Sequence, residues 1–480
     1  MIGILVAVGM IKDNYFVGGG TADLRPIPTV IGPRLTVFLA AVGLVLSLWL
    51  IIPDRYFLSQ NADYEGYFEP AAKNLLHGYG FTWHGPSSSE GIPNVGFHLP
   101  PGSLFIRFPP AYLLMVTAAM ATAEKFHLPA IYAIDALNVL AIGISAVCLF
   151  SIAAMVFGER RALLAPLLCV TYPGILLATK GGNAEIQLCA AVLGAVALLW
   201  RAVRYARRRM LGFFGAGLIF GCAMLVRTQG IVLLPACLIW LLVFPRQEQL
   251  RVRLGWVAVT LIASALAIAP WELWVYARSG ALVPLATEGP ASVYDGLTFA
   301  AKAAAPNAPP AAEFPDEVKR LSADFLVACR HSPSVFSTLA YVGTQFRLRP
   351  KAVAEFFLIK AFRSWYATSS GQFDHDSLIL NLAYGLLFVW VLAVAVRRAG
   401  PPRLLATLVL SVVFSTWAVT IMVLSIVRYM IPAIAVMFVL TPAAIGFGRK
   451  KAPSVWVAPP TSEQPPSRDP ERTDLAARRA

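Results

Sequence analysis

Ten blocks of apolar residues, most of them close to the length that crosses a lipid bilayer, dominate this chain of 480 residues. A helix needs about 20 residues to cross the hydrocarbon core, and in lipid its backbone polar groups must be satisfied internally. With 58% hydrophobic and 14% charged residues, the composition also lies outside that of soluble domains. We therefore predict an all-α polytopic membrane protein with about ten transmembrane helices. The blocks cover residues 35–52, 130–157, 162–178, 186–203, 211–226, 231–244, 254–275, 378–396, 404–427 and 430–447.

Basic residues gather in the short connections between these blocks, at positions 160–161, 201–209, 246–253, 397–403 and 449–451. Cytoplasmic loops carry such an excess of Lys and Arg, so the first block is expected to run outward. A further apolar stretch, residues 104–123, is interrupted by Arg107 and Pro109-Pro110 and is assigned to the outer interface. The net charge of +14 therefore marks orientation, and no nucleic-acid partner is expected.

This alternation predicts the domain organisation of the chain. We expect a cytoplasmic N-terminal segment, an N-terminal transmembrane module with a long first outer loop, a mixed second outer loop, C-terminal transmembrane helices and a disordered cytoplasmic tail. In the same order these cover residues 1–34, 35–275 (loop 53–129), 276–376, 377–447 and 448–480.

The first outer loop contains a pattern typical of an amphipathic helix. Apolar side chains fall on one helical face, and Asp63 and Gly78 stand where an N-cap and a terminating glycine belong. The apolar positions are Tyr64, Tyr67, Phe68, Ala71, Ala72, Leu75 and Leu76. Such a helix suits the membrane surface. Asp63 is then either a capping residue or an outward-facing functional carboxylate.

Several short motifs follow in order along the chain: residues 74–81 (NLLHGYGF), 100–102 (PPG), 181–185 (GGNAE), 217–230 (a glycine-rich span ending in LVRTQG), 270–271 (PW) and 427–432 (VRYMIP). Together with the topology, these motifs resemble the GT-C superfamily of membrane glycosyltransferases. The resemblance is to glycosyltransferase family 39 and its relatives, which include protein O-mannosyltransferases and lipid A aminoarabinose transferases. The sequence departs from the family before PPG, where Phe97 and His98 replace a charged residue and Glu90 is the nearest acid upstream.

The resemblance implies transfer of a sugar from a polyprenyl-phosphate donor to an acceptor on the outer face, with inversion at the anomeric carbon. Such a reaction needs a base for the acceptor hydroxyl and positive charge for the departing phosphate. Asp63 is the candidate base, and Glu185 is a second carboxylate that either assists or binds a divalent metal. The candidate phosphate-binding or substrate-binding residues are Arg227, Lys360, Arg363, Arg428, Tyr67 and His98.

The implied partners are the lipid-linked sugar donor, a glycolipid, polysaccharide or protein acceptor, and the bilayer. The implied location is a bacterial inner membrane, with the site facing the periplasm or exterior. No metal-ligating residues are assigned, because neither cysteines nor histidines have the spacing of a metal site, and a divalent metal stays possible only through the carboxylates. The identities of the sugar and the acceptor are open.

Each candidate also has a structural interpretation. Lys360 and Arg363 can be interfacial cations whose heads reach the membrane surface, Arg227 and Arg428 can form ion pairs inside the bundle, and Glu185 can be an acid favoured at a helix start. A secondary transporter or a polymer-export protein is the alternative function. Transporters place ionisable residues near the bilayer midplane, whereas here the charges cluster at outer span ends, which favours the enzyme.

Overall fold

The computed structural model describes residues 31–53, 63–83, 102–205, 208–302, 314–329, 334–368 and 373–445. His98, Glu90 and the predicted cytoplasmic tail lie outside these residues. Helices make up most of the described chain, and its strands are one short antiparallel pair, β1 (Thr82–Trp83) and β2 (Ser103–Leu104). The expected all-α architecture is confirmed.

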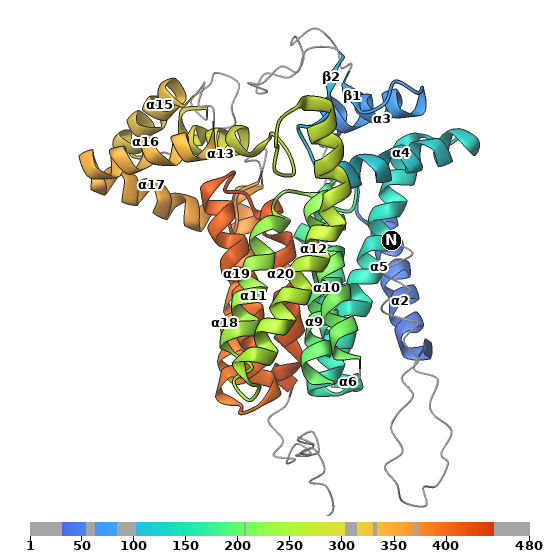
Figure 1. Cartoon of the computed structure of the whole chain (residues 1–480). Coiled ribbons are helices and arrows are strands. Elements are labelled where there is room, and N and C mark those ends of the chain that lie inside the picture. Colours follow the sequence, from blue (N-terminus) through green and yellow to red (C-terminus); the bar gives the residue numbers. More distant parts are fainter. Residues whose placement is uncertain are drawn as a thin grey trace, which may run out of the picture.

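Eight described helical segments are long and apolar enough to cross a membrane, and they run side by side as a bundle (Figure 1). They are α2 (Ile31–Ile51), α5 (Ala130–Phe157), α9 (Ala184–Arg204), α10 (Arg209–Val226), α12 (Leu250–Ser279), α18 (Asp374–Arg397), α19 (Pro401–Met422) and the run of η4 (Val427–Met430), α20 (Ile431–Met437) and η5 (Phe438–Ile445).

The other two predicted spans correspond to shorter elements. Residues 162–178 form α7 (Leu164–Thr171) and α8 (Pro173–Leu177), following the short α6 (Glu159–Ala162). The break falls at Pro173, which has no N–H to continue the helical ladder. The second is α11 (Gly230–Val243), which is 14 residues long and contains Pro235. Among the described residues, eight helices are therefore long enough to cross a membrane, where about ten spans were predicted.

Two groups of helices lie at the end of the bundle that we predict to be the outer one (Figure 1). The first outer loop forms the π-helical turn η2 (Tyr64–Phe68), α3 (Glu69–Leu76) and α4 (Pro110–Lys125). The second forms α13 (Gly289–Leu297), α14 (Phe299–Lys302), α15 (Asp316–Ala328), α16 (Val335–Leu348) and α17 (Pro350–Arg363). A separate apolar core around Phe325 and Phe356 holds α13 to α17 together.

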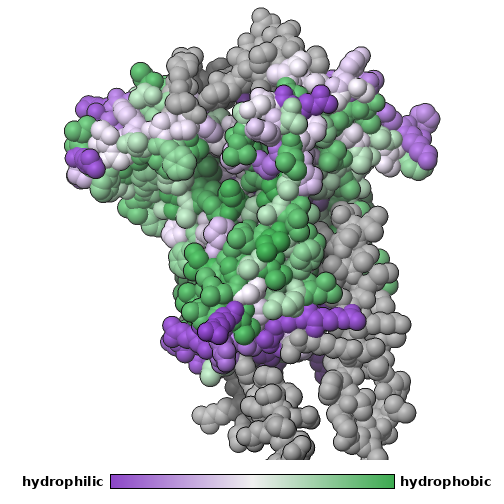
Figure 2. Space-filling model, in the orientation of Figure 1, coloured by the Kyte–Doolittle hydropathy of each residue, from purple (hydrophilic) through white to green (hydrophobic). Residues whose placement is uncertain are grey.

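The surface pattern agrees with a multi-pass membrane protein. On the face shown in Figure 2, hydrophobic side chains form a broad band across the bundle, and hydrophilic side chains gather at its two ends. Inside the bundle, α9 is the most enclosed span, with 89% of its apolar window buried. The chain is therefore an integral multi-pass membrane protein.

Two glycines let α10 and α12 pack in direct contact. A Cβ atom on Gly217 would lie 2.2 Å from the carbonyl oxygen of Thr260, and one on Gly221 would lie 2.7 Å from that of Ser264. The Ser264 hydroxyl donates to the Gly217 carbonyl over 2.8 Å. Small residues at helix crossings permit such close approach in membranes. This crossing fixes α10, which ends immediately before Arg227.

Candidate active site

Four charged side chains from distant parts of the chain meet at the end of the bundle that we predict to be the outer one. Asp63 immediately precedes η2, Glu185 lies in the first turn of α9, Arg227 follows α10, and Arg428 lies in η4. Arg227 Nη1 lies 3.2 Å from Glu185 Oε1, and Arg428 Nε lies 2.9 Å from the same oxygen. We call these four residues the charged cluster.

The two carboxylates of the charged cluster occupy different environments. The Glu185 side chain is fully buried, whereas that of Asp63 is 24% exposed. Asp63 Oδ2 lies 3.7 Å from Arg227 Nη2 and 3.8 Å from Arg428 Nη2. Glu185 therefore anchors the two guanidinium groups from within the bundle, while Asp63 faces the accessible side.

The amphipathic helix has the expected faces, but Asp63 makes no capping hydrogen bond with its side chain. Tyr64, Tyr67 and Phe68 are buried, and Glu65 is exposed. The Asp63 carboxylate instead points to the two arginines. The predicted structural ion pairs of Arg227 and Arg428 are present as well, so a catalytic role for these residues stays a proposal.

The remaining predicted cations lie elsewhere. The fully buried Lys360 donates hydrogen bonds to the carbonyls of Gly296 and Val423, and its burial lowers its pKa well below the usual value. Arg363 Nη1 lies 3.7 Å from Asp374 Oδ2. Lys360 thus joins α13 to the segment after α19, which leads to Arg428, and the structure does not bring it or Arg363 into the charged cluster.

Sequence reasoning missed three residues that border the charged cluster. Arg227 Nη2 donates to the Tyr429 hydroxyl over 3.2 Å, and Tyr429 stands next to Arg428 in a motif already noted. Arg107 lies with its guanidinium carbon 4.3 Å from the ring centre of the predicted site residue Tyr67. Glu288 lies in the second outer loop and interacts electrostatically with Asp63 and Arg227. It belongs to none of the sequence motifs described above.

A glycine pair connects the positions of the two carboxylates. Gly181 and Gly182 have φ values of +88° and +72°, a region open to glycine at little cost. The Gly181 N–H donates to Asp135 Oδ1 on α5 over 3.1 Å, which fixes this turn. A Cβ on Gly182 would lie 2.8 Å from Cγ of Tyr64, the residue after Asp63. The turn before Glu185 therefore seats the ring next to Asp63.

Replacing Gly182 by Ala is expected to displace Tyr64 and, with it, Asp63. We expect at least a tenfold loss of the activity proposed below, together with about 1–2 kcal/mol of backbone strain. Gly80 is the matched control, because its φ is +73° and a Cβ there meets nothing within 4 Å. Gly80→Ala should cost similar stability and leave activity near normal. Equal activity losses in the two variants would contradict the proposed contact.

Burial and the neighbouring Asp63 carboxylate raise the pKa of Glu288 to about 7. Folded protein therefore keeps this proton between about pH 4.5 and 7, where the unfolded chain has lost it. Because the folded state binds the extra proton, the group reduces stability as pH rises through that window. The melting temperature of Glu288→Gln should fall less between pH 5 and pH 8 than the melting temperature of the parent protein. Glu317→Gln, at an exposed position on α15, should follow the parent, and identical profiles for all three proteins would refute this assignment.

The two carboxylates of the charged cluster are the site's candidate metal ligands. Within the ranges that the structure describes, no group of three His, Cys, Asp or Glu residues is arranged to hold one. Asp63 and Glu185 each have two guanidinium groups as counter-ions. The steps proposed below are those of the chain's own groups.

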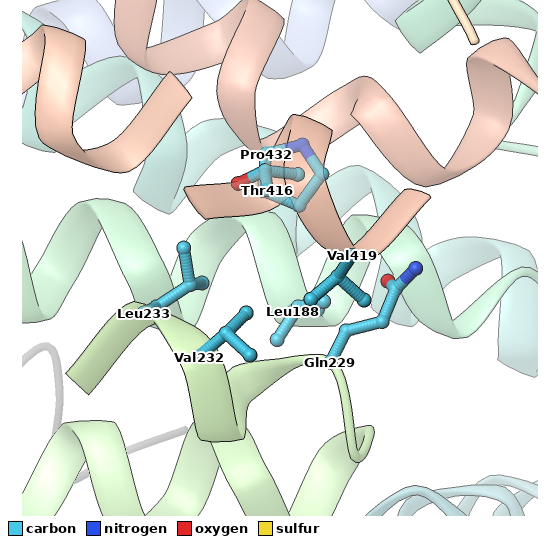
Figure 3. A pocket seen from close by; sticks show the side chains of 7 residues that line it. All are labelled: Leu188, Gln229, Val232, Leu233, Thr416, Val419 and Pro432. Carbon is cyan, nitrogen blue, oxygen red and sulfur yellow. The ribbon is translucent and has the colours of Figure 1, made fainter. Parts of the chain in front are cut away.

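A small pocket lies near the charged cluster (Figure 3). Leu188, Gln229 and Pro432 of its lining follow Glu185, Arg227 and Arg428 along the chain by two to four residues. The other lining residues are Val232, Leu233, Thr416 and Val419. The charged cluster therefore borders an apolar interior.

Comparison with known proteins identifies the fold. Residues 109–274 match the family model described as dolichyl-phosphate-mannose-protein mannosyltransferase. The structure is similar to the oligosaccharyltransferase AglB from Archaeoglobus fulgidus, solved with an inhibitory peptide and a dolichol phosphate, at a TM-score of 0.51 and 14% identity. The alignment covers 85% of this chain and 50% of AglB. The chain has the GT-C fold.

Two further structures are similar to this chain. The Archaeoglobus fulgidus oligosaccharyltransferase tethered to an acceptor peptide with the NVT sequon gives a TM-score of 0.50 at 14% identity, and the alignment covers 86% of this chain and 49% of that protein. ArnT from Cupriavidus metallidurans bound to undecaprenyl phosphate gives a TM-score of 0.40 at 15% identity, and the alignment covers 86% of this chain and 77% of ArnT. No curated protein sequence matches the chain. The chain spans about half the length of AglB, and the similarity establishes the GT-C fold alone.

Proposed function

We propose that this protein is a membrane glycosyltransferase that moves a sugar from a polyprenyl-phosphate donor to an acceptor at the outer membrane face. The observation that carries the proposal is the charged cluster, where four segments far apart in the chain bring two carboxylates and two arginines together. Sugar transfer from a lipid phosphate needs a base for the acceptor hydroxyl and positive charge for the departing phosphate. The accessible Asp63 carboxylate and the two arginines supply these groups. The family-model match and the dolichol phosphate bound to AglB support a lipid-linked donor.

Asp63 acts as the general base in this reaction. Its carboxylate accepts the proton of the acceptor hydroxyl while that oxygen attacks the anomeric carbon of the donor sugar. The bond between the anomeric carbon and the phosphate oxygen breaks, and the phosphate keeps the electron pair. A single displacement of this kind inverts the anomeric centre. The 24% exposure of the Asp63 side chain leaves it open to the acceptor.

Arg227 and Arg428 stabilise the departing phosphate. A guanidinium group carries five N–H donors in a planar fork, so binding to Glu185 leaves donors for phosphate oxygens. Because both groups meet Glu185 Oε1 at 3.2 and 2.9 Å, their positions are set before the lipid arrives. Glu185 is then a positioning residue that holds the arginines, and preorganised charge of this kind needs no rearrangement during the reaction.

The proposed location follows from the charge distribution. All five basic clusters of the connecting loops lie at one side of the predicted topology, which is the cytoplasmic side by the positive-inside rule. The charged cluster lies at the other end of the bundle. We place the site on the periplasmic or exterior face of a bacterial inner membrane.

The experiment measures release of polyprenyl phosphate, which reports transfer to any acceptor. Purified protein in liposomes receives labelled polyprenyl-phosphate mannose, with membrane extract as the source of acceptors. We expect extract-dependent release of polyprenyl phosphate with loss of the sugar to the acceptor fraction. A transporter would move labelled material across the vesicle without cleavage. No release from mannose, glucose, galactose or aminoarabinose donors would overturn the proposed activity.

A further inference from the structure

The two outer loops are joined directly beside the charged cluster. The Thr287 N–H donates to the Ile106 carbonyl over 3.0 Å, and the Glu288 N–H donates to the Arg107 carbonyl over 3.2 Å. These two successive bonds place Glu288 next to Arg107. The electrostatic neighbours of Glu288 include Asp63 and Arg227, so this junction borders the site that contains the proposed base.

Tyr67 supplies a buried hydroxyl at the same junction. It follows Asp63 by about one turn of the wide π-helical segment, in which hydrogen bonds span five residues. Its ring lies under the Arg107 guanidinium and 5.5 Å from the ring centre of Phe108. The side chain is 5% exposed, and within the described ranges its hydroxyl has no hydrogen-bond partner. A buried polar group without a partner costs about 1–3 kcal/mol, which a ligand hydroxyl would recover.

The groups at this junction have complementary hydrogen-bonding properties. The Glu288 pKa of about 7 keeps a substantial fraction of this carboxyl protonated near neutral pH, so it can donate as well as accept. The phenol of Tyr67 also does both, and the Arg107 guanidinium donates. Sugar hydroxyls are also donors and acceptors, so they match these three groups.

We propose that Tyr67, Arg107 and Glu288 form a subsite that binds the hydroxyl groups of a sugar ring beside Asp63. This inference rests on the proposed glycosyltransferase function and names the part of the site that recognises carbohydrate. The sugar comes either from the donor or from the acceptor, and both present the same chemistry to these three residues. In the proposed reaction the arginines of the charged cluster bind the donor phosphate.

The test compares two lipids, polyprenyl phosphate and polyprenyl-phosphate mannose, by their affinity for purified protein in native mass spectrometry. The variant is Tyr67→Phe, which removes only the hydroxyl. Because that hydroxyl has no partner in the described structure, the melting temperature should not fall. Tyr132→Phe, at a position 62% exposed on α5, is the matched control.

The parent protein should bind polyprenyl-phosphate mannose more tightly than polyprenyl phosphate. If Tyr67→Phe lowers this affinity ratio about tenfold, the subsite binds the donor sugar. If the ratio is unchanged and the KM for the acceptor extract rises, the subsite binds an acceptor sugar. Unchanged lipid affinities and unchanged transfer kinetics would overturn the subsite. This failure is distinct from failure of the proposed function, in which the parent protein itself releases no polyprenyl phosphate.

Discussion

Asp63→Asn should lower sugar transfer by about 100- to 10,000-fold, the range typical of a lost general base, while affinity for polyprenyl phosphate is kept or increased. Asparagine has nearly the same shape but cannot accept the acceptor proton. It also removes a negative charge 3.7–3.8 Å from the two arginines, which leaves them more positive toward phosphate. The measurements are polyprenyl phosphate release in liposomes and lipid binding by native mass spectrometry.

Glu65→Gln is the control for this prediction. Glu65 lies two residues away in η2, but it is exposed on the opposite face of the helix. The Glu65→Gln substitution removes the same charge from the same segment, and we expect transfer near the parent rate. Transfer by Asp63→Asn at the parent rate would remove Asp63 as the base. A simultaneous loss of transfer and of lipid binding would assign Asp63 a role in folding the site.

Glu185→Gln should destabilise the protein by about 3–5 kcal/mol, the usual result when one partner of a buried ion pair is removed. Glu185 is fully buried and is the nearest counter-ion of both arginines. Without it, the two guanidinium groups repel each other, and their remaining ion-pair partner in the charged cluster is Asp63, at 3.7 and 3.8 Å. Unfolding in detergent followed by tryptophan fluorescence measures the loss, and transfer should fall with it.

Asp316→Asn separates this explanation from a helix-dipole effect. Asp316 is also an acidic residue in the first turn of its helix, but its side chain is 83% exposed. A carboxylate at a helix start contributes about 0.3–1 kcal/mol. A comparable small loss in Glu185→Gln would show that Glu185 serves the helix start and does not organise the arginines.

Hydropathy and charge predicted the bundle well because both depend on local sequence. Block length identified eight spans directly. Block length did not show that the helix over residues 162–178 breaks at Pro173, or that α11 is only 14 residues long. Breaks of this kind are tolerated where neighbouring helices surround the backbone, and those neighbours are not visible in the hydropathy of one segment. The amphipathic helix was also readable, since its apolar residues recur with the helical period.

The candidate site was predictable where charges stand at the ends of spans. Asp63, Glu185, Arg227 and Arg428 stood out because charged residues are scarce, and the topology placed them at one membrane face. Lys360 matched the same criterion, yet the structure encloses it between two carbonyls. Glu288 reaches the site only through the backbone contact between residues 287–288 and 106–107, and such a tertiary contact leaves no pattern in one sequence.

The most direct test of the central claim is an experimental structure of the protein with bound polyprenyl phosphate in a lipid nanodisc. We predict density for the phosphate within hydrogen-bonding distance, about 3 Å, of the Arg227 or Arg428 guanidinium, with the Asp63 carboxylate on the side where the sugar would lie. A phosphate bound at Arg363, or anywhere away from the charged cluster, would contradict the assignment of this cluster as the site of sugar transfer.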